Sequence, residues 1–258
     1  MAKAPKKENT LPAELANAFE ADAGMGLEDI TTSDMQMPFL RIIQALSPQL
    51  KKNDPAFIEG ASQGDVFNTV TNKIWEADKG VTVLPVHFIM KLLEFVPRQS
   101  GGGFVGELHH NSPEVRQAVR DKDSGMELLP NGNELVRTAQ HYVKIVHEDG
   151  NLESAIVDMK KTQIKVSRKW NSLAHMQKHN GATLPSFANT YQLSSVEDGN
   201  DKGSWYSWSV KVGSPVPSME AYYECKELHT NIRKGELQIS VAPSDLMLDD
   251  QSSDEVPF

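Results

Sequence analysis

Thr138-Ala-Gln-His-Tyr-Val-Lys-Ile-Val-His147 and Leu152-Glu-Ser-Ala-Ile-Val-Asp-Met159 are separated only by Glu148-Asp-Gly-Asn151. Apolar and polar residues alternate in the first segment, which places Ala139, Val143 and Ile145 on one face and Tyr142 and Lys144 on the other. The Glu-Asp-Gly-Asn segment has the composition of a hairpin turn. Residues 138–159 therefore predict two antiparallel strands that each turn one face toward a core.

The segments on either side of this hairpin indicate the fold class. Residues 81–97 form a long β-rich run, in which Pro85 and the loss of alternation near Lys91 indicate a bend or a bulge. Residues 163–178 have helical periodicity, and residues 187–196 and 204–212 have that of strands. The order strand, strand, strand, helix, strand, strand is that of an oligonucleotide-binding (OB) fold. We therefore predict a mainly β protein, an OB-fold-like five-stranded Greek-key barrel with N-terminal and C-terminal helical additions.

The composition divides the chain into three predicted parts. Residues 1–36 read as a flexible N-terminal arm with a short helix near 12–23, and residues 245–258 read as a disordered acidic tail. The domain between them, residues 37–244, is the predicted OB-like part. It carries a polar insertion at 107–136 with at most one helical turn.

Three smaller elements complete the predicted domain. Residues 38–50 begin with a proline and place Phe39, Ile42, Ile43 and Leu46 on one helical face, which predicts a packing helix. Residues 65–76 predict a small hairpin, and residues 217–234 predict a last helix.

The net charge of −9 would argue against a nucleic-acid-binding protein if it were spread evenly. Residues 1–10 carry +2, residues 11–36 carry −6 and residues 245–258 carry −5, so residues 37–244 are neutral. Within this neutral domain, residues 160–178 hold six basic residues and no acidic residue. The acidity therefore belongs to the ends of the chain, and a basic segment lies within the domain.

The cysteine content and the hydropathy of the sequence indicate the cellular compartment of the protein. Cys225 is the single cysteine, which excludes an internal disulfide framework and fits a reducing cytoplasm. The sequence holds no run of about 18 apolar residues, and no apolar segment follows the basic N-terminus as it would in a secretory signal. We expect a cytoplasmic protein.

The sequence contains no pattern that favours catalysis or metal binding. The glycines at 101–103 lack the lysine and the helix of a phosphate-binding loop. Cys225 and His229 are four residues apart on a predicted helix and could pair a thiolate with a base, but a lone cysteine is more often part of the packing. His175 and His179 could hold a metal ion, but no third ligand has a suitable spacing. We predict no catalytic residue, no metal and no cofactor.

Basic residues recur on the helix predicted after residue 160, at spacings of three and four that place them on one face. Such a stripe can neutralise successive phosphates and release their counterions, which gives salt-dependent binding without sequence preference. A solvated helix face is the other interpretation. Trp170 lies about 100° around the helix, where it either anchors the helix or lies at the edge of the stripe. The predicted DNA-binding residues of this segment are Lys160, Lys161, Lys165, Arg168, Lys169 and Trp170.

Aromatic side chains on polar strand faces offer flat surfaces on which unpaired bases stack. Trp205 and Lys211 lie on the face of strand 204–212 opposite to its apolar residues, and Tyr142 and Lys144 lie on the corresponding face of strand 138–147. We predict that these four residues bind DNA. Ordinary half-exposed sheet residues are the other interpretation.

The glycine triplet at 101–103 predicts a flexible loop. Arg98 lies before this triplet and Phe104 lies directly after it. Both are predicted DNA-binding residues, because a cation and an aromatic ring on one loop suit a phosphate and a base.

The last five residues are Asp254-Glu255-Val256-Pro257-Phe258, at the end of a segment with five carboxylates and no basic residue. A terminal aromatic ring can fill an apolar pocket while the acidic residues contact a basic rim. The ending resembles the C-terminal tip of bacterial single-stranded DNA-binding proteins, which finish in an acidic run followed by Ile-Pro-Phe. The resemblance implies a docking tail, and a solubilising acidic terminus is the other interpretation. The predicted partner-binding residues are Asp249, Asp250, Asp254, Glu255, Pro257 and Phe258.

Several further stretches carry a second resemblance. They are Met37-Pro-Phe-Leu-Arg-Ile-Ile-Gln-Ala-Leu-Ser-Pro-Gln-Leu50, Gly64-Asp-Val-Phe-Asn-Thr-Val-Thr71, Gly101-Gly-Gly-Phe-Val-Gly-Glu107 and Ser167-Arg-Lys-Trp-Asn171. Together with the acidic tip, they are similar to bacteriophage single-stranded DNA-binding proteins. This similarity implies an OB core, a role in phage replication or recombination in the cytoplasm of the bacterial host, and contact with replication enzymes through Phe258.

Two hypotheses for the function result from these observations. The first is a non-enzymatic protein that binds single-stranded DNA without sequence preference and recruits a helicase, primase, polymerase or nuclease through its tail. The alternative is a protein–protein adaptor that binds no DNA and whose tail engages a host replication factor.

Overall fold

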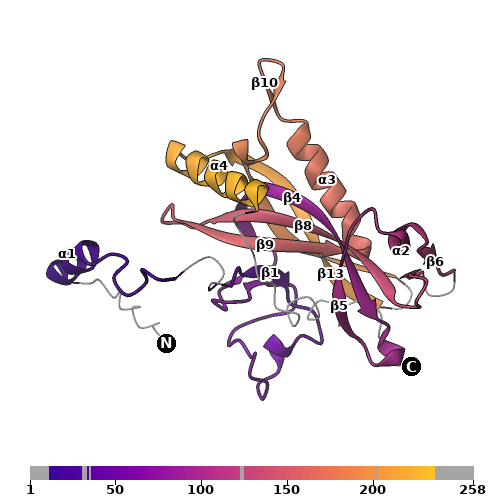
Figure 1. Cartoon of the computed structure of the whole chain (residues 1–258). Coiled ribbons are helices and arrows are strands. Elements are labelled where there is room, and N and C mark those ends of the chain that lie inside the picture. The colour runs from indigo at the N-terminus through magenta and orange to yellow at the C-terminus, as the bar shows by residue number, and fades with distance from the viewer. Residues whose placement is uncertain (1–11, 31–33, 35, 123–124, 201–202, 236–258) are drawn as a thin grey trace.

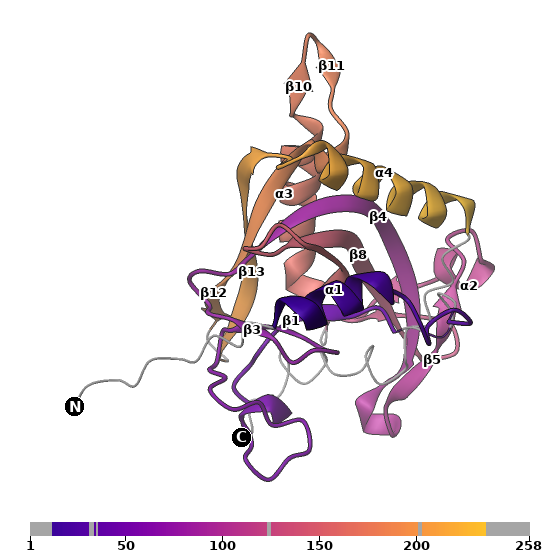
Figure 2. The ribbon, with the colours of Figure 1, turned by 90° about the vertical axis from the view of Figure 1, so that its left-hand side faces the viewer.

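In the computed structural model the chain is mainly β and carries a few helices (Figure 1). The structure describes residues 12–30, 34, 36–122, 125–200 and 203–235. Within this described part, 11 strands form one sheet, which curls into a half-barrel (Figure 2). These strands are β1 (Phe39–Ile42), β2 (Val66–Asn68), β3 (Ile74–Trp75), β4 (Val81–Val96), β5 (Gly103–Leu108), β6 (Val119–Arg120), β7 (Glu127–Leu128), β8 (Glu134–Val146), β9 (Leu152–Lys160), β12 (Asn189–Asn200) and β13 (Gly203–Pro215).

The helices and a small ribbon lie around this sheet. The ribbon pairs β10 (Lys178–His179) with β11 (Ala182–Thr183). The α-helices are α1 (Ala13–Ala21), α2 (Pro113–Arg116), α3 (Ile164–His175) and α4 (Met219–Lys234), and short 3-10 turns span Pro48–Leu50, Arg98–Ser100, Lys161–Gln163 and Ser186–Ala188. None of the described helices is long and apolar enough to cross a membrane.

Four antiparallel strands form the centre of the sheet. Their spatial order is β12, β4, β8, β9, which is the order of a Greek key because the fourth strand returns beside the first. α3 lies between β9 and β12 in the chain, and β13 pairs along β12. The register of β4 against β8 shifts between Pro85 and His87. The predicted element order, the hairpin of residues 138–159 and the bend at Pro85 are therefore confirmed.

The prediction of a five-stranded barrel is wrong, because the sheet continues beyond β9. β9 pairs in parallel with β1, and β1 pairs with the predicted hairpin of β2 and β3. At the other end, the side-chain amide of Gln44 donates to Tyr206 O at 2.8 Å and accepts from Tyr206 N at 2.9 Å on β13. Segments far apart in the sequence thus extend the sheet and bring its two ends together.

The predicted packing helix over residues 38–50 is a strand followed by a 3-10 turn. All four residues of β1 are buried. Phe39 packs with Tyr142 and Ile156 on one face of the sheet, whereas Leu40 and Ile42 enter the core on the other face. A strand buried on both faces has a continuous apolar run, which periodicity does not distinguish from a buried helix.

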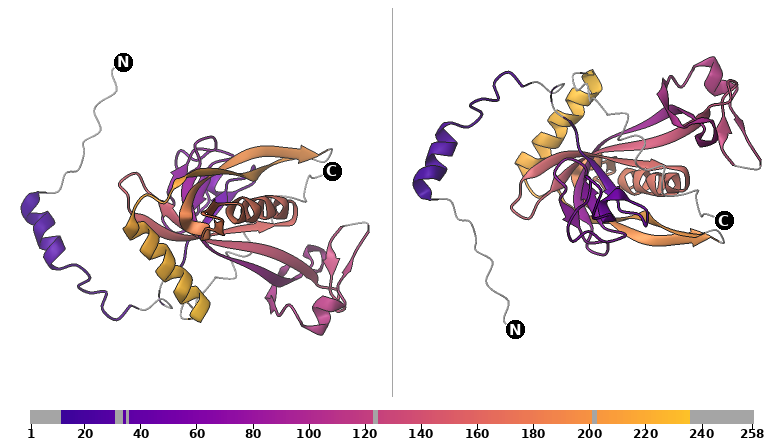
Figure 3. Two further views of the ribbon diagram at one scale, coloured as in Figure 1. Left: turned by 90° about the horizontal axis from the view of Figure 1, so that it is seen from above. Right: turned by 90° about the horizontal axis from the view of Figure 1, so that it is seen from below.

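α3 and α4 cover opposite faces of the sheet. Trp170 of α3 packs with Val143 and other inner residues of the curl, whereas Ala221, Cys225 and Leu228 of α4 pack on Leu84 and Val86 of β4. Figure 3 shows α3 inside the curl and α4 outside it. Burial raises the pKa of the Cys225 thiol to about 12, so this cysteine belongs to the packing.

The predicted insertion is a small lobe at the far end of β4 and β8. β5 pairs with β4, and β7 joins the short β6 to the start of β8. Its helical turn is α2, as predicted. Leu92, Leu129 and Leu135 form its buried cluster, against which Val115 of α2 packs.

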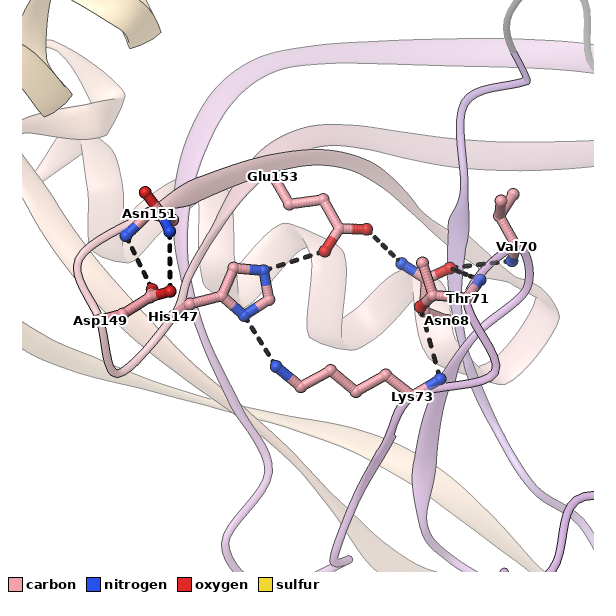
Figure 4. Close-up of polar contacts among 8 residues, drawn as sticks. All are labelled: Asn68, Val70, Thr71, Lys73, His147, Asp149, Asn151 and Glu153. Atoms are coloured by element: carbon pink, nitrogen blue, oxygen red, sulfur yellow. Dashed lines mark hydrogen bonds and ion pairs between the residues drawn. The ribbon is translucent and has the colours of Figure 1, made fainter. Parts of the chain in front are cut away.

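A hydrogen-bonded chain joins the β2–β3 hairpin to the β8–β9 hairpin (Figure 4). Lys73 Nζ lies 2.9 Å from His147 Nδ1, and His147 Nε2 lies 2.9 Å from Glu153 Oε2. Glu153 Oε1 accepts from the Asn68 amide at 2.6 Å, and Asn68 in turn accepts from the backbone N–H groups of Val70 and Thr71. These contacts fix the added hairpin on the Greek-key strands.

α1 lies apart from the sheet in Figures 1 and 3. None of its residues is buried. The short helix predicted near residues 12–23 is confirmed, and it contributes nothing to the core that the described residues form.

Candidate nucleic-acid interface

Five of the predicted DNA-binding residues lie on one face of the sheet, here named the α4 face because α4 covers part of it. This face is the side of β4, β5, β8 and β9 opposite to α3. Tyr142 of β8 packs with Ile232 of α4, and Lys144 of β8 contacts Glu224 of α4. Successive side chains of a strand alternate between its two faces. Thr138 and Gln140 therefore also belong to this face. The predicted residues on it are Phe104, Tyr142, Lys144, Lys160 and Lys161.

A row of polar residues crosses three strands of the α4 face. Lys91 of β4 and Lys160 of β9 both pair with Thr138 of β8, one on each side. Directly opposite residues in a sheet have Cβ atoms about 5 Å apart. The two lysines are therefore two strand spacings apart, about 10 Å, with Thr138 between them, and Lys161 follows Lys160 in the chain.

An aromatic pair lies at the distal end of the same face. Phe104 of β5 and Phe95 of β4 have ring centroids 5.5 Å apart at an interplanar angle of 60°. They pack with Leu93 and Val136, which occupy the strand positions next to the lysine row. Arg98 lies on the 3-10 turn between β4 and β5. Phe104 thus lies on the same face of the sheet as Lys160, and Arg98 lies on the turn beyond that end of β4.

Lys161 has an unusual backbone conformation. Its φ is 46°, and the other described non-glycine residues with positive φ are Asn72 and Asn180. Asparagine tolerates the left-handed region, whereas a lysine there costs about 1–2 kcal/mol. The chain adopts this conformation where β9 ends and the 3-10 turn before α3 begins.

Carboxylates from other elements approach several of these cations. Lys91 Nζ lies 2.6 Å from Glu107, Lys144 Nζ lies 3.3 Å from Glu224 of α4, and Lys161 Nζ lies 3.9 Å from Glu134. The segment of residues 160–178 has no acid of its own, so its local charge overstates the positive potential at the surface. A ligand phosphate at these lysines competes with carboxylates for their ammonium groups.

The α4 face contains two buried polar side chains, those of Thr138 and Gln140. Within the described part of the chain, neither Thr138 Oγ1 nor Gln140 Nε2 has a hydrogen-bond partner. Both residues are fully buried. A buried unpaired donor costs about 1–3 kcal/mol, so these two side chains reduce the stability of this part of the sheet.

The structure overturns the predicted exposure of Tyr142. The side chain is 4% exposed and packs with Phe39, Ile156 and Ile232 of α4. Burial, followed by the nearby charge of Asp158, raises the pKa of Tyr142 to about 12. The alternation of β8 placed the ring on the correct face, but α4 covers that position, so the ring is not a free stacking surface.

Trp170 is likewise a core residue. Its side chain is 1% exposed and stacks on His141 with ring centroids 4.3 Å apart and planes at 17°. Burial lowers the pKa of His141 to about 3, so the imidazole is neutral, and its Nε2 lies 2.8 Å from Ser167 Oγ. Trp170 therefore anchors α3 inside the curl, which was one of its two predicted positions, and its buried ring offers no free face on which a base could stack.

A second group of predicted residues lies on α3 and the β12–β13 hairpin. Arg168, Lys169 and Lys211 are exposed, and Trp205 is half-buried. Lys165 Nζ contacts Asp198 of β12 at 3.1 Å, and Asp198 lies directly opposite Trp205 in the hairpin. The structure thus brings Lys165 and Trp205 together through Asp198.

A family model described as Pam3 phage gp34-like protein matches residues 6–238. The chain belongs to this family. The bacteriophage part of the predicted resemblance is thereby confirmed. No curated protein and no solved structure matches the chain.

The predicted acidic tail, residues 245–258, lies beyond the matched range. Its predicted partner-binding residues also lie outside the residues that the structure describes. They are Asp249, Asp250, Asp254, Glu255, Pro257 and Phe258.

Three residues of the α4 face were not predicted from the sequence: Lys91, Thr138 and Gln140. Lys91 falls where the alternation of β4 is hard to read, because apolar residues surround it on both sides. Thr138 and Gln140 precede Tyr142 at the same period of two. That period was the available signal for grouping them with Tyr142.

Proposed function

We propose that this protein binds single-stranded DNA without sequence preference and has no enzymatic activity of its own. The observation that carries the proposal is the pair of cations Lys91 and Lys160, on either side of the buried Thr138, on the same face as the half-buried ring of Phe104. Cations that track a backbone and aromatic rings that stack bases are the two requirements of single-strand binding.

The topology supports the same proposal. In an OB fold the face of the second and third strands binds oligonucleotides. β8 and β9 are the second and third strands of the Greek key here, and Thr138 and Lys160 lie on them. An OB-like core that has acquired extra strands is the finer fold assignment that we propose.

Equilibrium titration of fluorescent poly-dT with the full chain tests the proposal. We expect binding that weakens as salt rises, with a logarithmic slope of about −2 for three phosphate contacts at roughly 0.7 each. The three contacts correspond to Lys91, Lys160 and Lys161. Absence of binding at low salt would contradict the proposal and favour the alternative, a protein–protein adaptor that binds no DNA. The carboxylates beside the lysines would then leave no site for a phosphate.

We further propose that the acidic tail recruits replication or recombination enzymes in the cytoplasm of the bacterial host. The tail would also compete with DNA for the basic residues, because a tethered anionic segment reaches a high local concentration. Deletion of residues 245–258 is expected to tighten poly-dT binding about three- to tenfold at low salt, and the gain should shrink as salt screens the charges.

Phe258→Ala provides the matched control for the tail deletion. It keeps all five carboxylates, so poly-dT affinity should remain at the wild-type value while binding of a partner enzyme is lost. Equal affinities of the wild-type and truncated proteins at low salt would remove the competition, and retained partner binding by Phe258→Ala would remove the docking role of the ring.

A further inference from the structure

The tip of the β12–β13 hairpin holds a charged cluster separate from the α4 face. Lys165 Nζ, from the first turn of α3, lies 3.1 Å from Asp198 Oδ2. Asp198 Oδ1 accepts from the backbone N–H of Gly199 at 3.0 Å. The Lys165 contact, followed by the Gly199 hydrogen bond, lowers the pKa of Asp198 below its usual value. The carboxylate is therefore ionised and held against the lysine.

Trp205 belongs to the same cluster through Ser207. Trp205 is the residue directly opposite Asp198 in the antiparallel ladder, where side chains lie about 5 Å apart. Its Nε1 donates to Ser207 Oγ at 3.1 Å, and a hydrogen bond from Ser207 also contributes to the lowered pKa of Asp198. The indole is thus held in one orientation beside the carboxylate.

An anion between an ammonium group and an indole has the arrangement of a nucleotide phosphate next to a stacked base. We propose that Asp198 occupies the phosphate position of a nucleotide subsite formed by Lys165 and Trp205. Single-stranded DNA must displace this carboxylate from Lys165 to bind there. The inference rests on the proposed function and assigns to Asp198 a regulatory role in it.

The consequence is that removal of the Asp198 charge strengthens binding. Asp198→Asn keeps the size and the Gly199 hydrogen bond but no longer neutralises Lys165. We expect the affinity for poly-dT to rise about three- to fivefold at low salt, because a solvent-exposed ion pair has a modest strength. The salt slope should become steeper by roughly 0.7, the value for one added phosphate contact on a single strand.

Glu197→Gln is the matched control. Glu197 precedes Asp198 and is exposed. Its replacement by glutamine removes the same formal charge, so this variant reports the long-range electrostatic effect alone. We expect it to change the affinity by less than about twofold, because charges farther from the contact are screened by salt.

A double-mutant cycle with Lys165→Gln separates the direct contact from a general effect. The gain from Asp198→Asn should disappear in the Lys165→Gln protein. Equal gains for Asp198→Asn and Glu197→Gln, or a gain that persists without Lys165, would overturn the subsite while leaving DNA binding intact. Failure of the wild-type protein and all variants to bind poly-dT would overturn the proposed function and the subsite together.

Discussion

Replacement of Trp170 by alanine is expected to lower the free energy of unfolding by about 3–5 kcal/mol, the usual cost of removing a buried tryptophan. The ring is 1% exposed and stacks on His141 inside the curl of the sheet. It also packs at 5.9 Å from Tyr191, with the ring planes at 51°. Its loss would leave a cavity between α3 and β8. Because β8 is held between β4 and β9, it cannot move to fill that cavity. Chemical denaturation followed by far-UV circular dichroism measures the change.

Two variants make this expectation specific. Within the described residues, Trp170 Nε1 has no hydrogen-bond partner, so Trp170→Phe should be less costly, at roughly 1–2 kcal/mol. Trp205→Ala, the same substitution at a half-buried position, should cost less than Trp170→Ala. A Trp170→Ala protein of wild-type stability that no longer bound poly-dT would restore the DNA-binding role and contradict the core assignment.

Replacement of both Lys91 and Lys160 by glutamine is expected to weaken poly-dT binding by roughly 60-fold at about 50 mM salt and by roughly tenfold at about 200 mM. The range follows from two lost phosphate contacts at about 0.7 each in the logarithmic salt slope. The slope itself should fall by about 1.4. Titrations at several salt concentrations give both quantities. Stability should change little, because Glu107, the partner of Lys91, is half-exposed and remains solvated without it.

Lys51 and Lys52 provide the matched control for this pair. They are adjacent and exposed, in the turn after the Pro48–Leu50 segment, and lie on none of the four strands that form the α4 face. Their replacement by glutamine removes the same net charge and should change poly-dT affinity only slightly. Equal losses in the two double mutants would show that net charge, and not the lysine row, governs binding.

The long strands, the helices α3 and α4 and their order were predictable because each follows from short-range periodicity. Residues 138–159 encode a hairpin through alternation and a Glu-Asp-Gly-Asn turn, and the structure pairs Tyr142 with Ile156 as that hairpin requires. The prediction failed for residues 38–50, where burial on both faces removes the alternation. It also failed for the strand number, since the pairing of β1 with β9 joins distant segments.

The candidate site was predictable in residue type more than in arrangement. Lys160, Lys161 and Phe104 were found from local composition, and the structure places them on one face with Lys91. Trp170 and Tyr142 were predicted to bind DNA, although other elements bury them. The sequence of one strand or helix does not show which other element will cover it. The acid-free segment 160–178 looked strongly cationic because the acids that approach it, Glu134 and Asp198, come from other strands.

By itself the sequence determined the mainly β class, the succession of the long strands around α3, the separation of the acidic ends from the neutral domain and the residue types available for binding. These properties depend on residues within a few positions of one another, so the periodicity and the charge of the sequence predict them directly. Only the tertiary structure decided how the sheet is extended, which aromatic rings are buried and which lysines face carboxylates. Those outcomes depend on contacts between segments such as β1 and β9, or Lys165 and Asp198, which no local pattern specifies.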